Sequence, residues 1–242
     1  MSGSNRNASI CCNICGGTNF SDMPKRPKVR CMTCGSLERT RAVALHIDKL
    51  ALSSGSSILH FAPELGLSQK LRALDGVNYR AVDLNPERFK AFGLDIDIER
   101  FDLAVDIFDL PENTYDLIVH NHVLEHPECN YTVILLKLAK ALTENGVMLF
   151  TVPVLPGHFS DELIKLSHQE KVARFGPMIH VRRFGADFLQ ETLGMIFRLP
   201  ERYDLTRSFK ESILLEANIP EHHWRAYTGA SVFEVRRRDI RV

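Results

Sequence analysis

The chain has 242 residues, of which 45% are hydrophobic and 25% are charged, and its 30 basic side chains balance its 30 acidic ones. This composition is that of an ordinary globular protein, and it excludes whole-chain disorder, a collagen and a disulfide-rich miniprotein. No apolar run reaches the roughly 18–20 residues of a membrane span, and the polar residues 1–10 contain no apolar core of a secretory signal, so we expect a cytoplasmic protein with reduced thiols.

The zero net charge conceals a gradient along the chain. Residues 1–50 carry 8 basic and 3 acidic side chains, whereas residues 51–150 carry 8 basic and 15 acidic ones. This shift predicts a small basic module ahead of an acidic one. The acidic middle disfavours wrapping around a polyanion there and suits a ligand that is cationic or rich in hydroxyl groups.

The pattern predicts a disordered tail (1–10), a cysteine-rich segment (11–35) and a connecting helix (36–52) that Ser36 caps. From residue 53 to residue 242, short apolar segments alternate with helical ones, which predicts an α/β domain around a mostly parallel, Rossmann-like sheet. A loop-rich insertion at about 153–185 is expected to cover or bind a substrate. The expected strands are 57–61, 79–82, 101–105, 116–119, 147–152, 196–199 and 231–237. The expected helices are 68–74, 86–92, 132–142 and 187–193.

The cysteine-rich segment has the spacing of a metal-binding ribbon. Cys12 and Cys15 form one C-x-x-C pair, and Cys31 and Cys34 form a second. Two such knuckles direct four thiolates at one point, which suits a tetrahedral, structural Zn²⁺. A redox dithiol and an iron–sulfur cluster are the alternatives, and Cys11 is a possible substitute for Cys12.

Polar residues follow the first expected strands of the α/β domain. The segment 58–66 (ILHFAPELG) leads from the first strand into the first helix, and Asp83 ends the second strand. In an open α/β sheet this is where a ligand binds, and a carboxylate at the end of the second strand can accept hydrogen bonds from a ribose diol.

The order of these motifs resembles that of class I S-adenosylmethionine-dependent methyltransferases. The resemblance is carried by segments 106–111 (DIFDLP), 115–126 (YDLIVHNHVLEH) and 143–153 (TENGVMLFTVP). A subgroup with an N-terminal zinc ribbon is similar also at 34–39 (CGSLER), 60–64 (HFAPE) and 175–187 (FGPMIHVRRFGAD). Of the family's glycine-rich first turn only Gly66 is present, because Ala62 and Glu64 occupy the other glycine positions.

The resemblance implies S-adenosylmethionine as cofactor. Residues 62–66 would pack the methionine part, Asp83 would bind the ribose, Asp106 and Ile107 would read the adenine, and Asn121 and His122 would face the sulfonium. The implied cofactor-binding residues are Phe61, Ala62, Pro63, Glu64, Gly66, Asp83, Leu84, Asp106, Ile107, Asn121 and His122.

The acceptor side is expected in the insertion. His180 is the first candidate for a general base and His122 the second, while Arg182 and Arg183 together with His180 would bind the acceptor. Segment 122–126 also matches the H-x-x-E-H metallopeptidase pattern, but Pro127 disfavours a helix there.

The favoured function is O-methylation of a saccharide or another small metabolite. The alternatives are an RNA methyltransferase, in which the basic ribbon contacts RNA, and a non-catalytic adaptor on a degenerate fold. The sequence leaves the oligomeric state open.

Overall fold

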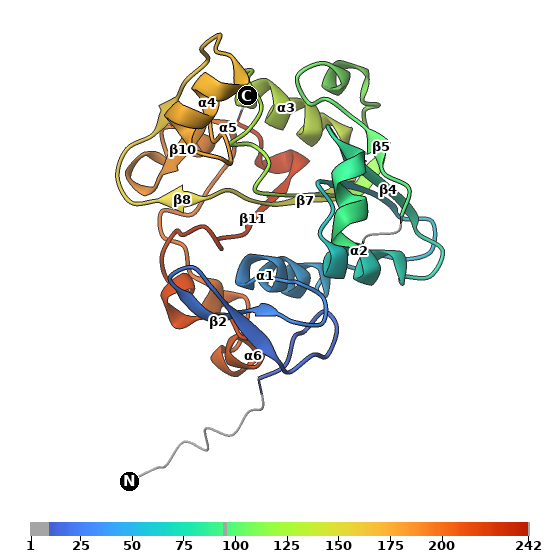
Figure 1. Ribbon diagram of the computed structural model, residues 1–242. Coiled ribbons are helices and arrows are strands. Elements are labelled where there is room, and N and C mark those ends of the chain that lie inside the picture. The colour runs from blue at the N-terminus through green and yellow to red at the C-terminus, as the bar shows by residue number, and fades with distance from the viewer. Residues whose placement is uncertain (1–9, 94–95, 242) are drawn as a thin grey trace.

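The computed structural model describes residues 10–93 and 96–241 of the chain (Figure 1). A six-stranded sheet forms its centre, and all neighbouring strands are parallel except β11, which is antiparallel to β7. In spatial order the strands are β11 (Phe233–Arg236), β7 (Leu142–Thr151), β6 (Tyr115–Asn121), β3 (Ser57–Phe61), β4 (Asn78–Asp83) and β5 (Glu99–Arg100). The expected Rossmann-like, mostly parallel sheet is therefore confirmed.

Both faces of the sheet are buried, which explains why its strands are apolar without interruption. In β6, Ile118 lies in the core with helix α3 (Tyr131–Ala141), whereas Leu117 and Val119 lie in the core with α1 (Glu38–Ile47) and α2 (Leu65–Arg72). The short helices α5 (Leu193–Ile196) and α6 (Glu211–Glu216) extend these two cores, α5 beside α3 and α6 beside α1.

Short 3-10 helices form part of the connections. They are η1 (Pro86–Phe92), η2 (Asp106–Asp109), η3 (Ala186–Phe188), η4 (Leu205–Arg207), η5 (Glu221–His223) and η6 (Arg237–Asp239). The first of them, η1, lies where a helix was expected at 86–92. Among the residues that the structure describes, no helix is long and apolar enough to cross a membrane.

Several predicted elements are wrong in extent or type. The connecting helix is shorter than expected, and Leu37 precedes it as N-cap, because the Ser36 hydroxyl lies 3.2 Å from the sulfur of Cys12 and 3.3 Å from that of Cys34. The strand expected at 101–105 is a loop, since Asp102 and Asp106 bond to nearby backbone N–H groups, and β5 lies just before it.

The C-terminal predictions also need correction. Residues 187–193 run from the end of η3 through a turn into the start of α5, so they form no continuous helix. Helix α5 also occupies the start of the strand expected at 196–199. Within that segment, Phe197 forms an isolated antiparallel bridge with Ile240, and the described residues form no strand there. The strand expected at 231–237 is confirmed as β11.

The insertion is more ordered than a loop-rich segment would be. It contains a small sheet in the order β8 (Val154–Leu155), β10 (Arg182–Gly185) and β9 (Ser160–Asp161). It also contains α4 (His168–Phe175), which begins with a capping box between Ser167 and Glu170.

The cysteine-rich segment forms a hairpin of β1 (Phe20–Met23) and β2 (Arg26–Cys31), and Figure 1 shows it beside α1 and α6. Arg41 of α1 is fully buried at this junction. Its guanidinium donates to the carbonyl oxygens of Val29, Ser36, Ala217 and Asn218 at 2.7–2.9 Å. One side chain thus joins the hairpin, α1 and the turn after α6.

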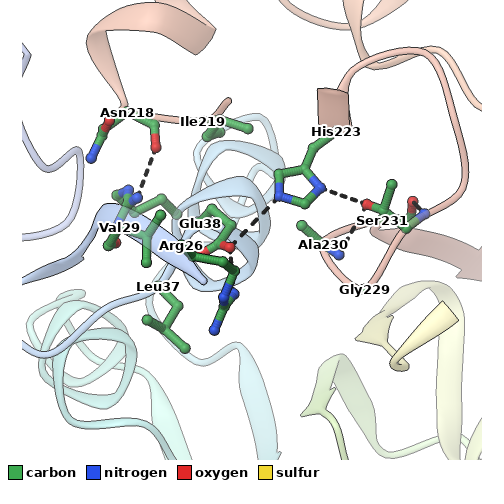
Figure 2. Close-up of polar contacts among 12 residues, drawn as sticks. Arg26, Val29, Leu37, Glu38, Asn218, Ile219, His223, Gly229, Ala230 and Ser231 are labelled. Atoms are coloured by element: carbon green, nitrogen blue, oxygen red, sulfur yellow. Dashed lines mark hydrogen bonds and ion pairs between the residues drawn. The ribbon is translucent and has the colours of Figure 1, made fainter. Parts of the chain in front are cut away.

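A buried carboxylate strengthens the same junction. Glu38 lies between Arg26 of the hairpin and His223 near the C-terminus, whose Nε2 is 3.6 Å from Glu38 Oε1 (Figure 2). Burial alone would raise the pKa of Glu38, but His223 and Arg26 outweigh it and lower that pKa to about 2. The ionised form of Glu38 therefore favours the folded chain.

We expect this stabilisation to disappear in acid. Because the pKa of Glu38 is depressed in the folded chain, its contribution is complete above the unfolded value near 4.5 and is lost as the pH falls toward 2. Glu38→Gln should lower the free energy of unfolding by on the order of 2 kcal/mol at pH 7. Urea unfolding should show this difference shrinking by more than half at pH 3, and a constant difference would contradict the assignment.

Candidate functional site

The candidate site lies at the carboxyl ends of β3, β4 and β6. Phe61, the last residue of β3, pairs with Val82 of β4 and with His120 of β6. The next residues, Ala62, Asp83 and Asn121, therefore reach the same edge of the sheet. The chain order reverses here, since β4 lies on one side of β3 and β6 on the other, and ligands of open α/β sheets bind at such a point.

The turn after β3 adopts the conformation that a glycine would favour. Ala62 has a φ of 48°, in the left-handed region where a Cβ is strained. Its N–H donates to the carbonyl of Val82, which holds the turn beside β4. Phe61 is almost fully buried against Phe101, so only its backbone lies at the turn. Pro63 and Glu64 complete the turn, and Glu64 is the N-cap residue of α2.

We call the region between the carboxyl ends of β3, β4 and β6 the crevice, after the position at which open α/β sheets bind ligands. Glu64 connects the turn after β3 to the end of β6 there. One carboxylate oxygen accepts from the Thr40 hydroxyl at 2.8 Å, and the other accepts from the Asn121 amide at 2.7 Å. The Arg39 guanidinium lies 3.8 Å away. Both carboxylate oxygens of Glu64 therefore hold the turn to α1 and β6.

Asp83 is the carboxylate at the end of β4. It accepts from the backbone N–H of Asn85 at 2.8 Å and from the guanidinium of Arg88 at 2.7 Å. The Arg88 side chain is half-exposed and rests over the Phe89 ring, so it is free to move aside, whereas the Asp83 side chain is buried. A diol that bound to Asp83 would replace Arg88 as its partner.

Exposed apolar side chains follow β4 and flank η2. Leu84, Val105 and Phe108 each have more than half of their surface exposed. The Asp106 carboxylate accepts from the backbone N–H of Asp102, and Ile107 is buried in the core. The Ile107 side chain is thus structural. Val105 and Arg88 belong to no motif, and Phe108 lies in the segment 106–111 without having been assigned a role, so the sequence did not predict these three residues for the site.

A cluster of imidazoles and one carboxylate follows β6. Glu125 is fully buried, and burial raises its pKa to about 7. His122 has a φ of 53°, and the His126 and His180 rings are 4.9 Å apart. Burial lowers the pKa of His122 to about 3 and that of His126 to about 4, and it also lowers the pKa of His180. The three imidazoles are therefore neutral at pH 7.

The segment with the H-x-x-E-H pattern is not helical, so it lacks the geometry of the metallopeptidase motif. Of the two candidate bases, His122 already contacts the carbonyl of Gly229 through Nε2 at 2.8 Å. His180 is half-buried and lies just before β10 in the insertion. The structure thus brings His122 and His180 to one cluster, together with Glu125 and His126, to which the sequence reading assigned no role.

The two arginines predicted to bind the acceptor have structural contacts instead. Arg182 has no exposed surface; it donates to the carbonyls of Leu124 and Cys129 and pairs with Asp161 at 2.9 Å. Arg183 donates to the carbonyls of Pro156 and His158. These contacts hold loops of the insertion together, and the full burial of Arg182 argues against its predicted contact with the acceptor, whereas Arg183 remains partly exposed.

The four cysteines of the hairpin region converge. Their sulfurs lie within 4.8 Å of one another, with 3.7 Å between Cys12 and Cys34 and 3.6 Å between Cys15 and Cys31. These separations are far too long for disulfides, and all four thiols are free. Four sulfurs at about 2.3 Å from a zinc ion lie about 3.8 Å apart, so the residues fit a tetrahedral ion. Cys11 is outside this group, which excludes the slipped register.

The cysteine cluster lies directly against the turn after β3. A Cβ added to Gly66 would be 2.9 Å from the Cys34 sulfur and 3.2 Å from the Ile14 side chain. Gly66 was expected to contact a cofactor, but its missing side chain instead makes room for the cysteine cluster. The close approach of the two sulfurs lowers the pKa of Cys12 and raises that of Cys34, so Cys12 is the thiol of this pair that ionises first.

A family model described as "Methyltransferase domain" matches residues 38–193. No curated protein matches the chain. An S-adenosylmethionine-dependent methyltransferase of Mesorhizobium loti is similar, with 22% identity, 47% of this chain and 54% of that chain covered and a TM-score of 0.37. A complex that contains the Trm112 methyltransferase activator of Haloferax volcanii matches with 17% identity, coverages of 63% and 65% and a TM-score of 0.41. The chain spans about half to two-thirds of these two structures.

We expect removal of a metal from the cysteine cluster to loosen two segments that are far apart in the sequence. Residues 12–34 should lose protection because four close thiolates repel one another without an ion. Residues 62–68 should lose protection as well, since Gly66 packs on Cys34. Hydrogen exchange before and after chelation measures both effects, with β6 and β7 as the internal reference. Unchanged exchange in residues 12–34 would contradict the metal assignment.

Proposed function

The chain belongs to the family of methyltransferase domains, and we propose that it transfers a methyl group from S-adenosylmethionine to a hydroxyl of a saccharide or another small metabolite. The observation that carries this proposal is the buried Asp83 carboxylate at the end of β4, level with the open turn after β3. We also propose that Cys12, Cys15, Cys31 and Cys34 bind a structural Zn²⁺, which the sulfur separations support.

The residues of the crevice fit the proposed cofactor. S-adenosylmethionine supplies an activated methyl group on a sulfonium whose leaving group is a neutral thioether. Asp83 would accept hydrogen bonds from the ribose hydroxyls once Arg88 moves aside. Leu84, Val105 and Phe108 offer apolar surface for the adenine, and Asp106 and the Ile107 amide would bind its polar edge.

The methionine part would lie against the turn from Ala62 to Glu64. Ala62 already adopts a left-handed backbone, so the turn keeps the path of a glycine-rich one although only Gly66 is a glycine. The link from Glu64 to Asn121 keeps the turn and the end of β6 at a fixed separation. The chain's contribution is thus to align the methyl group with the acceptor in a site that excludes water.

The acceptor would enter from the insertion side. We assign to His180 the role of accepting the proton of the acceptor hydroxyl or of positioning the group that accepts this proton. Its imidazole is half-buried and neutral at pH 7. In the cysteine-rich hairpin Arg26 is paired with Glu38, whereas Lys25, Lys28 and Arg30 are exposed and keep RNA as the alternative acceptor.

Calorimetric titration with S-adenosylmethionine and S-adenosylhomocysteine tests the cofactor assignment. We expect micromolar affinity for the wild-type chain and at least tenfold weaker binding for Asp83→Ala, which loses charge-assisted hydrogen bonds. Asp75→Ala is a matched control, because this exposed carboxylate precedes β4 at its opposite end. Arg88→Ala should bind at least as tightly as wild type, since it frees Asp83.

Equal affinity of Asp83→Ala and wild type would contradict the proposal. If the folded chain bound neither molecule but bound an acceptor tightly, the adaptor function would replace it. Methylation of bulk RNA, with affinity that falls steeply with salt, would point to the RNA alternative.

A further inference from the structure

The cluster after β6 has the composition of a second metal site. One ligand atom each of Glu125, His126 and His180 lies within 4.8 Å of the other two. Two segments supply them: 122–126 follows β6, and 179–180 precedes β10. None of these residues belongs to the cysteine cluster, and Asp83 and the turn after β3 use none of them.

Glu125 lies in this cluster without a partner. It has no exposed surface, and neither carboxylate oxygen accepts a hydrogen bond from any described residue. The guanidinium groups of Arg39 and Arg182 are close enough to favour the ionised carboxylate, but neither bonds to it. Arg182 binds backbone carbonyls and Asp161, and Arg39 lies 3.8 Å from Glu64. A buried carboxylate without hydrogen bonds is costly, so a proton or a cation must balance it.

The hydrogen bonds of the neighbouring imidazoles fix where their lone pairs lie. A carbonyl oxygen only accepts, so His122 Nε2 carries the hydrogen that it donates to Gly229, and its Nδ1 is a lone-pair atom. This Nδ1 is 3.7 Å from Glu125 Oε1.

His126 follows the same logic with its nitrogens exchanged. Its Nδ1 donates to the carbonyl of Ile179 at 3.4 Å, so its Nε2 is the lone-pair atom and lies 3.9 Å from Glu125 Oε1. Two imidazole lone pairs and a carboxylate oxygen thus face one another. Backbone carbonyls that orient metal-bound histidines in this way are the usual outer shell of a metal site.

Arg182 holds the two segments together. It joins the carbonyls of Leu124 and Cys129, on the β6 side, to Asp161 of the insertion, and its own backbone N–H donates to the carbonyl of Glu125 at 3.2 Å. Its guanidinium also lies 4.9 Å from the Tyr131 ring centre. The position of His180 relative to Glu125 is therefore set by buried contacts.

We propose that Glu125, His126 and His180 bind a divalent transition-metal ion, with His122 adjacent to them. Two imidazoles and one carboxylate suit Zn²⁺, Co²⁺, Fe²⁺ or Mn²⁺ better than Mg²⁺ or Ca²⁺, which prefer oxygen ligands alone. Ligand atoms at about 2.1 Å from an ion lie roughly 3.4 Å apart, so binding requires the side chains to contract by about an ångström.

Three protein ligands leave a coordination position open. His122 directly follows Asn121, which bonds to the turn after β3, so the ion would lie beside the crevice. On the proposed function, the ion would bind the acceptor oxygen and lower its pKa. His180 would then be a ligand, and the proton of the acceptor would pass to the lone-pair Nδ1 of His122, the second candidate base. Ion binding itself does not depend on the proposed function.

The test is a titration of the full chain, zinc-loaded at the cysteines, with Co²⁺. We expect one further equivalent to bind, with visible absorption bands of nitrogen and oxygen ligation, no thiolate charge-transfer band and no release of zinc. Glu125→Gln and His180→Ala should bind Co²⁺ roughly tenfold to hundredfold more weakly. His168→Ala, at an exposed position of α4, is the matched control and should bind as wild type does.

A stability measurement separates loss of the site from loss of the fold. Glu125→Gln removes a buried, unpaired charge, so its thermal midpoint without Co²⁺ should equal or exceed that of wild type, and only wild type should gain stability from the ion. Absence of the extra equivalent, or equal Co²⁺ affinity in Glu125→Gln and His180→Ala, would overturn the metal site. If the metal site is overturned but wild type and both variants still bind S-adenosylhomocysteine equally, the cofactor site of the proposed function is unaffected by that result.

Discussion

The contact between Gly66 and Cys34 sets how the N-terminal hairpin meets the α/β sheet. Any side chain at Gly66 would enter the space of the Cys34 sulfur, so the cysteine cluster lies directly on the first turn of α2. The loop 62–64, which leads from β3 into this first turn of α2, borders the crevice on its other side. The cysteine-rich hairpin therefore packs behind the turn of the proposed cofactor site. Arg41 and Glu38 hold it there through buried polar contacts.

A second set of contacts crosses the crevice itself. Glu64 links the turn after β3 to Asn121 at the end of β6, and Asn121 in turn accepts from Thr151 at the end of β7. Neighbouring parallel strands are thereby tied at the edge where ligands bind. This bonding gives a physical reason why the turn tolerates Ala62 and Glu64 in place of glycines. The backbone path of the turn after β3 depends on the hydrogen bonds of Glu64 and on packing against the cysteine-rich hairpin. A glycine is needed only at Gly66, where the sulfur of Cys34 leaves no room for a side chain.

Local pattern was enough to predict five of the six strands of the sheet, all but the two-residue β5, and the convergence of the four cysteines. Continuous apolar runs identify buried parallel strands, and paired C-x-x-C spacings identify one metal centre, because both depend on neighbours in sequence. Residues whose surroundings come from distant segments could not be predicted in this way. Arg182 has the side chain of an anion clamp, but carbonyls more than fifty residues away surround it.

Gly66 and Glu125 illustrate the same limit. Gly66 matches a cofactor glycine by position, whereas its role follows from the sulfur packed on it in three dimensions. Glu125 belongs to a sequence pattern typical of a helical metal site, yet its cluster forms from an irregular segment and a histidine of the insertion. The short helices and the Asp102–Asp106 loop were missed because side chains there bond to the backbone within a few residues, which hydrophobic periodicity does not detect.

The affinity for S-adenosylhomocysteine with and without metal at the cysteines tests most directly whether the cysteine hairpin supports the turn after β3. We predict that the metal-free chain, with its sheet intact by circular dichroism, binds at least tenfold more weakly than the zinc-loaded chain. Equal affinity in the two states would contradict it and would show that the ribbon and the turn after β3 touch without supporting one another.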